Sequence, residues 1–184
     1  KVIGGGKYFY TSPITGEVFY SVGQDTATNR MTGSPNVTIS SGVGTFTTAQ
    51  TGNIGVGDKV TYNTNVIAYI SGKISTTQWR LTTAVGQPAP DVGSPVAVVS
   101  ITRAYASLFA AEAGATDATH LNDATGNLVT GSFILNFPLY YDTGADTTAV
   151  AITGYTTGPN NYIRVYTPYD TANEVTQTQR HDGK

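Results

Sequence analysis

Hydrophobic and polar residues alternate in short runs along most of the chain, the pattern of β-strands with one buried face. In NVTIS, residues 36–40, Val37 and Ile39 would face one side of a sheet and the polar residues between them the other. Turns rich in Gly, Pro, Asn and Asp separate the runs. The predicted strands lie at residues 7–10, 17–22, 36–40, 44–50, 59–63, 66–74, 78–84, 96–101, 127–130, 132–141, 148–155 and 161–167. The chain is therefore expected to be all-β, and its first two strands, which flank TSPITG, to form a hairpin.

One segment departs from this pattern and predicts a short helix. Residues 102–115, TRAYASLFAAEAGA, are rich in Ala, contain Leu, Phe and Glu, and lack Pro. An apolar stripe at spacing i, i+3 and i+4 is formed by Tyr105, Leu108 and Phe109. Thr102 is the predicted N-cap of this helix and Gly114 its C-cap.

The order of these elements resembles the start of a right-handed parallel β-helix. The segments GNIGVGDKVTYN, ISGKISTTQWRLTTA, YYDTGADTTAVAITGY and NYIRVYTP also resemble parts of large bacterial surface proteins with such pectate-lyase-like solenoid bodies, over about residues 51–184. The resemblance implies that the helix covers the open end of a solenoid, and it carries no catalytic residues.

Three parts of the chain follow from the pattern and the resemblance together. Residues 1–22 form an N-terminal arm and hairpin, and residues 23–101 a small antiparallel domain of sandwich or barrel type. Residues 102–184 contain the capping helix, followed by the first rungs of a β-helix or by a second β-sandwich.

Composition narrows the functional classes. Hydrophobic residues make up 39% of the chain, enough for a core, but only 12% are charged, as in many extracellular proteins. The net charge of −2 argues against a broad basic surface for nucleic acid. Without cysteine there is neither a disulfide nor a Cys-ligated zinc site. No apolar run approaches the roughly 18 residues of a membrane span.

The strand predicted at residues 161–167 raises the question of what covers it, because no further strand is predicted after it. A solenoid ending there would leave unpaired backbone groups and an uncovered core. Three explanations stay open: the chain is a fragment of a longer protein, residues 171–184 fold back, or a second subunit docks. A start at Lys1 rather than Met fits either a removed leader or an excised piece.

Docking of a second subunit gives the main functional hypothesis. Residues 1–10, KVIGGGKYFY, combine a glycine hinge with an aromatic segment that could add a strand to a neighbour's open edge. The expected interface comprises Tyr8, Phe9, Tyr10, Tyr162, Ile163 and Val165. Repeated head to tail, the contact would build a filament or coat. We expect a non-catalytic extracellular structural protein whose partners are copies of itself.

The remaining residues contain no recognisable catalytic motif. GGGK lacks the spacing of a phosphate-binding loop, and no Gly-x-Ser-x-Gly motif is present. His120 and His181 both lie in polar loop sequence, where solvent exposure is expected. We expect no enzymatic activity.

Carboxylates in turns offer the only metal candidates. Asp142 and Asp146, in DTGADT, form a candidate calcium site, although the turn does not match an EF-hand and capping of its own backbone is the favoured interpretation. Asp117 and Asp123 form a second candidate of the same kind. No other cofactor is expected.

Two alternatives remain. One is a glycan-binding or glycan-cleaving β-helix module of a larger secreted protein, using Trp79 or Asp142, with Asp146, Asp170 and Glu174 as further carboxylates. The other is a viral decoration or tail-fibre protein. Asn36 begins a glycosylation sequon, which would matter in a secreted protein.

Overall fold

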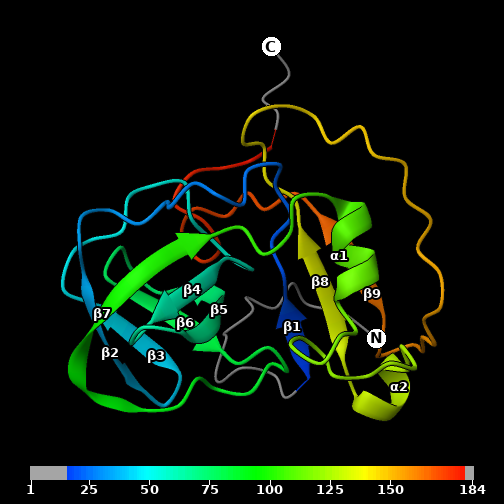
Figure 1. Ribbon diagram of the computed structural model, residues 1–184, viewed down its shortest axis with the longest axis horizontal. Helices are drawn as coiled ribbons and strands as arrows, with labels where there is room; N and C mark the ends of the chain where they lie inside the picture. Colours follow the sequence, from blue (N-terminus) through cyan, green and yellow to red (C-terminus); the bar gives the residue numbers. More distant parts are fainter. Residues whose placement is uncertain (1–15, 181–184) are drawn as a thin grey trace, which may run out of the picture.

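The computed structural model describes residues 16–180 of the chain. This part forms a closed antiparallel barrel beside a small parallel sheet, with two short helices against the sheet (Figure 1). The prediction of an all-β chain with an antiparallel barrel-like domain is confirmed. None of the helices in the described part is long and apolar enough to cross a membrane.

Six strands close the barrel in the order β2-β3-β6-β5-β4-β7. Their bounds are β2 (Asn36–Ser40), β3 (Val43–Phe46), β4 (Lys59–Tyr62), β5 (Val66–Lys73), β6 (Gln78–Thr82) and β7 (Val92–Thr102). The barrel closes because β7 is long enough to pair with β2 near its start and with β4 near its end.

The alternating pattern of the sequence accounts for the barrel core. Val37 and Ile39 point inward from β2, and the polar residues beside them are half-buried or exposed. Trp79, on β6, is fully buried in the centre of this cluster. Apolar side chains from all six strands therefore fill the interior, as expected for a small barrel.

The second sheet contains three parallel strands in the order β1-β8-β9. They are β1 (Glu17–Phe19), β8 (Ile134–Pro138) and β9 (Ile163–Tyr166). Figure 1 shows α1 (Leu108–Gly114) in front of β8 and β9, and α2 (Leu128–Gly131) near their lower ends. A second core joins one face of this sheet to the helices, with Val18, Leu135, Phe137, Ala111 and Leu128 among its members.

The structure corrects the β-helix expectation. A closed antiparallel barrel takes the place of a solenoid, and the three parallel strands come from distant segments rather than from successive rungs. The barrel closes because hairpin-connected strands meet around β7, a geometry that stacked coils do not have. The β-helix interpretation was wrong.

Several predicted elements also differ. β1 pairs with β8 in parallel, and the other strand of the expected hairpin, residues 7–10, lies outside the described residues. Residues 128–131 form α2 instead of a strand, capped by the Asn127 side chain, which accepts from Thr130 N. Residues 148–155 are not part of a strand in the structure.

Helix α1 begins later than predicted. Thr102 ends β7, and Ser107 is the N-cap, its side chain accepting from Ala110 N. Ala115 occupies the C-cap position predicted for Gly114. Ala111 is the residue of α1 that is buried, whereas Phe109 remains 53% exposed.

The segment after β9 folds back against the barrel. Val56 N donates to Glu174 O at 3.0 Å, and Thr176 N donates to Ile54 O at 3.0 Å. Val175 between them is fully buried. The fold-back that the sequence left open is therefore present up to residue 180, but it covers a barrel loop rather than the parallel sheet.

Candidate functional site

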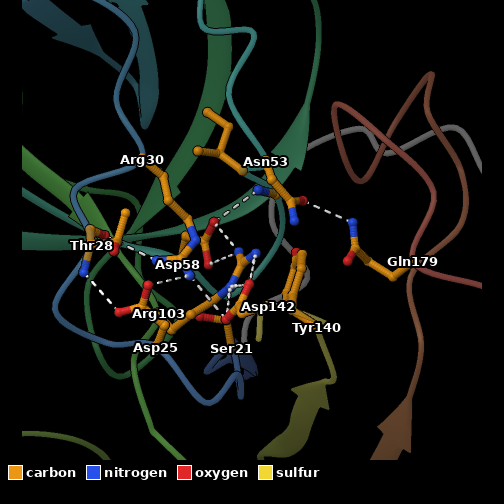
Figure 2. A network of polar contacts seen from close by, with 12 residues as sticks. Ser21, Asp25, Thr28, Arg30, Asn53, Asp58, Arg103, Tyr140, Asp142 and Gln179 are labelled. Carbon is orange, nitrogen blue, oxygen red and sulfur yellow. Dashed lines mark hydrogen bonds and ion pairs between the residues drawn. The ribbon is translucent and has the colours of Figure 1, made fainter. Parts of the chain in front are cut away.

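A buried charge network lies where the barrel meets the parallel sheet (Figure 2). Arg103, directly after β7, donates from Nη1 to both carboxylate oxygens of Asp58 at 2.8 Å. Its Nη2 donates to Asp142 Oδ1 at 2.9 Å. Arg103 and Asp58 are completely buried. The network therefore links the end of β7, the loop before β4 and the segment after β8.

Two further contacts complete the network. Arg30 Nη2 lies 3.0 Å from Asp142 Oδ2, so that Asp142 is paired with two arginines. The Arg103 guanidinium lies 3.6 Å from the centre of the Tyr140 ring, and the Tyr140 hydroxyl donates to Val56 O at 2.8 Å. These contacts place the start of the loop after β8 against the barrel.

Burial and ion pairing shift the pKa values of these groups in opposite directions. Burial raises the pKa of Asp58, and the Arg103 guanidinium opposes that rise. Desolvation alone would lower the pKa of Arg103, but Asp58 and Asp142 raise it above the ordinary value. Arg103 therefore stays charged. The arrangement is typical of a structural salt-bridge network, because each charged side chain is paired with another charged side chain of the network.

The two carboxylates of the candidate calcium turn do not face a common point. Asp142 is held by Arg103 and Arg30, whereas Asp146 accepts from Leu108 N at 2.9 Å and from Thr148 N at 3.0 Å. Within residues 16–180 no group of three or more His, Asp or Glu could hold a metal ion. Calcium binding stays a prediction, and this geometry gives it no support.

The other carboxylates predicted from turns also contact the backbone. Asp170 accepts from Ala172 N and Asn173 N, and Glu174 accepts from Tyr169 N and Asp170 N. Asp123 accepts from Thr125 N, and Asp117 from Thr119 N. These contacts are typical of Asx-type turns, which shape loops rather than bind substrates.

The remaining candidate residues, Trp79 and His120, lie in different parts of the structure. Trp79 is buried inside the barrel and cannot stack on a glycan at the surface. His120 packs against the rings of Tyr20 and Tyr105, each 5.0 Å away between centroids, and contacts Asp117 at 2.9 Å. It is therefore part of a packed cluster rather than a solvent-exposed loop. His181 lies outside the described residues.

Strand β9 has an open outer edge in the described part of the chain. Tyr162 O and Tyr166 O accept from Leu135 N and Leu139 N, so the backbone groups of residues 162, 164 and 166 point toward β8. The N–H and C=O groups of Ile163 and Val165 consequently point away from the sheet. No strand of residues 16–180 lies on that side, because β9 is the last in the order β1-β8-β9.

Side chains along this edge are partly apolar. Tyr162 is 42% exposed and Val165 is 38% exposed, whereas Ile163 is half-buried against the second core. These are the three residues that the sequence placed on the acceptor side of the interface. Tyr8, Phe9 and Tyr10, the proposed donor side, lie outside the described residues.

A pocket opens where the three parallel strands end. Its volume is about 830 Å³, and segments that follow β1, β8 and β9 line it: Val22 to Gln24, Leu139 to Tyr141, and Tyr166 with Thr167. The remaining walls are formed by Ala106 and Leu108, by the loop at residues 144–150, and by Gln179 with Arg180. Crevices at the carboxyl ends of parallel strands are common binding sites.

Sequence reasoning missed the charge network and the pocket. Arg103 had one usable signal, since a lone charge directly follows the apolar strand VAVVSI in a chain with only 12% charged residues. Asp58 had none beyond its place in a glycine turn. The pocket walls come from six separate segments, so that no local pattern marks them.

Comparison with known proteins adds no assignment: no family model, no curated protein and no solved structure matches the chain. The geometry of the open edge and of the pocket therefore carries the functional argument.

Proposed function

We propose that this chain is a non-catalytic extracellular structural module that assembles with copies of itself by β-strand addition to the outer edge of β9. The observation that carries the proposal is the outward direction of the Ile163 and Val165 backbone groups in an edge strand. Such an edge is a template for another strand, because each added residue pair forms main-chain hydrogen bonds.

The donor of the added strand is the N-terminal arm of a neighbouring copy. In the described part of the chain, β1 is already paired with β8, so residues 17–19 are not available for exchange. The arm is therefore limited to the residues before Gly16, which include the aromatic run at residues 8–10. Its aromatic side chains would cover Tyr162 and Val165, both exposed at present.

A structural role also agrees with the state of the polar side chains. The buried charges are paired across the junction of barrel and sheet, and the turn carboxylates accept backbone hydrogen bonds. Low charge content supports the extracellular setting. Fractionation of the producing cells tests this setting: the chain should be found in the medium or at the cell surface, and an exclusively cytosolic location would contradict it.

Deletion of residues 1–10 is the direct test of the donor. The shortened chain should keep its circular-dichroism spectrum and remain monomeric, whereas the full chain should form assemblies whose size increases with concentration in light scattering. Assemblies that persist after the deletion would show that the arm is not the donor. A full chain that stays monomeric at all concentrations would contradict self-assembly itself.

A matched pair of proline substitutions tests the acceptor. Val165→Pro removes an N–H that points away from β8, so the sheet should tolerate it while strand addition is blocked. Arg164→Pro removes an N–H directed toward β8, so it should destabilise the sheet itself. The proposal requires Val165→Pro to be folded and monomeric. Normal assembly of this variant would overturn β9 as the acceptor.

Hydrogen exchange gives a third readout on the same strand. In the monomer the outward amides of Ile163 and Val165 should exchange quickly, and on assembly they should become protected. Unchanged exchange in the assembled sample would place the contact elsewhere.

A further inference from the structure

The pocket at the carboxyl ends of β1, β8 and β9 has features of a ligand site that strand addition does not use. Its volume, about 830 Å³, lies within the range of small-molecule sites in proteins, roughly 300–1,000 Å³. Its walls are parts of the fold that are fixed by other contacts, since the segments after β1 and β8 continue the parallel pairing through a bridge between Val22 and Leu139. The cavity is thus held open by the sheet beneath it.

We propose that this pocket binds a short, neutral oligosaccharide. Tyr141 is the main contact: it lines the pocket and is 67% exposed, the highest exposure among the large hydrophobic residues of the described part. A tyrosine ring offers an apolar face for the C–H groups of a sugar and a hydroxyl for its oxygens. Tyr166, half-buried, also lines the pocket, and the Arg164 guanidinium lies 4.1 Å from the centre of its ring.

Uncharged polar side chains complete the lining. Gln24 donates through Nε2 to Ala145 O, and its Oε1 accepts from Thr143 Oγ1, which leaves one N–H and one lone pair of its amide for a ligand. Gln179 donates through Nε2 to Asn53 Oδ1 at 2.8 Å, so its Oε1 can accept from a hydroxyl group. Thr148 adds a hydroxyl to the loop wall. Amides and hydroxyls both donate and accept, as sugar hydroxyl groups do.

The charges of the lining favour a neutral ligand. Asp146 and Arg180 are the only ionised side chains among the pocket residues in the described part of the chain, and their charges are opposite. Asp146 accepts from two backbone N–H groups, and Arg180 stacks on Tyr169 at 3.7 Å from the ring centre. Neither sign dominates, so a phosphate or a polyanion would find no cluster of cations.

Binding without cleavage follows from the same lining. Glycoside hydrolysis requires two carboxyl groups about 5–10 Å apart on either side of the scissile bond. The pocket residues include one carboxylate, Asp146, and Asp142 beneath it is paired with two arginines. The site therefore recognises a glycan without the groups needed to hydrolyse it.

The test uses the full chain and named probes. Maltotriose, cellotriose, chitotriose and mannotriose are titrated separately, and binding is followed by NMR saturation transfer and by isothermal calorimetry. At least one trisaccharide should bind with millimolar or tighter affinity, with amide shifts concentrated after β1, β8 and β9. Absence of binding by all four at 10 mM, or shifts confined to other surfaces, would overturn the proposal.

Two variants of exposed aromatic residues and a salt series make the test specific. Tyr141→Ala should weaken binding between about two- and about tenfold, the loss expected for one aromatic contact. The matched control is Phe109→Ala, which also removes an exposed aromatic side chain but lies outside the pocket and outside the proposed assembly edge, and it should leave affinity unchanged. Affinity should be the same in 50 and 500 mM NaCl because the ligand is neutral. Equal effects of both variants, or a steep loss with salt, would contradict the assignment.

Discussion

The barrel and the parallel sheet differ in how their strand edges are hydrogen-bonded. Each of the six barrel strands has a neighbour on both sides, so the barrel has no free edge. The parallel sheet has three strands, and β9 is paired on one side within the described residues. A closed unit and an open unit therefore lie side by side in the same chain (Figure 1).

The barrel and the parallel sheet also differ in how far apart their paired strands lie in the sequence. Three of the six barrel pairings join strands that follow each other directly in the sequence: β2 with β3, β4 with β5, and β5 with β6. The parallel sheet joins β1 to β8 across more than a hundred residues. The barrel pairings close on themselves, whereas the parallel sheet keeps an outer edge at β9 within the described residues.

Removing Arg103 is the strongest way to break the connection between the two units. Arg103→Ala leaves the buried Asp58 and Asp142 without their shared partner and should cost about 3–5 kcal/mol of unfolding free energy. Trp79, the only tryptophan, reports on the barrel by fluorescence, and far-UV circular dichroism reports on the whole chain. In urea the two transitions should coincide in the wild type and separate in the variant.

The control for this experiment is Arg164→Ala on exposed β9, which should cost less than about 1 kcal/mol. Coincident transitions and a loss below about 1 kcal/mol in Arg103→Ala would show that the network does not couple barrel and sheet.

Gly57→Ala should have the next largest effect, because Gly57 is in direct contact with the segments after β1 and at the end of β8. Its φ is +87°, and an added Cβ would lie 2.4 Å from Ser21 N, whose hydrogen bond to Gly57 O is 2.9 Å long. The left-handed conformation alone costs about 1–2 kcal/mol for a residue with a side chain. Differential scanning calorimetry should show a Tm lower by at least about 2–4 °C.

Gly93→Ala is the matched control, since an added Cβ there meets nothing within 4 Å. It should leave the Tm nearly unchanged or raise it slightly. Equal Tm values for the two variants would contradict a tight junction at Gly57.

The smallest expected effect concerns the fold-back after β9 and depends on pH. Hydrogen bonds from the Asn173 side chain and from backbone N–H groups lower the pKa of Asp170. Because its folded-state pKa lies below the unfolded value, its stabilising contribution is present above about pH 4 and is lost as pH falls through the folded-state pKa. Asp170→Asn should therefore be less stable than the wild type at pH 7, by at most about 1 kcal/mol, and equally stable near pH 2.

Urea titrations of both proteins between pH 2 and pH 7 measure this difference directly. A gap between wild type and variant that widens as the pH falls would have the wrong sign for a carboxylate with a lowered pKa.

The barrel could be predicted from the sequence because its strands bury alternate residues. Val37 and Ile39 in β2 show the pattern and are buried in the core. The observed strands of the barrel lie at or within about four residues of the predicted ranges, with β7 the most extended. Three of the six pairings join consecutive strands and are local, so that pattern and fold agree there.

The rest of the fold could not be predicted, because the spacing of hydrophobic residues in a segment does not show which strand it pairs with. The apolar run at residues 127–130 has a strand-like composition but forms α2, since Asn127 caps it. Residues 148–155 alternate as a strand would and yet run beside α1 without joining a sheet. The pairing of β1 with β8, and hence the pocket above them, depends on contacts that no local window contains.

The candidate interface was partly accessible to the sequence. Ile163 and Val165 were chosen as edge residues because no later strand was predicted, and they do lie on an edge strand of the described part. No local pattern marks Tyr141 as a pocket residue. The sequence indicates Asp142 as a candidate for calcium or sugar binding, and only the fold shows its salt bridge to Arg103.

The position of β9 in the chain has a consequence for the order of events during synthesis. The ribosome releases the barrel strands, residues 36–102, long before residues 163–166, and domains generally fold as they emerge. The outer edge of β9 does not exist until β9 has paired with β8. Under the proposed strand addition, an arm could therefore not dock on an incompletely synthesised copy, and assembly would begin only after each copy had completed its own parallel sheet.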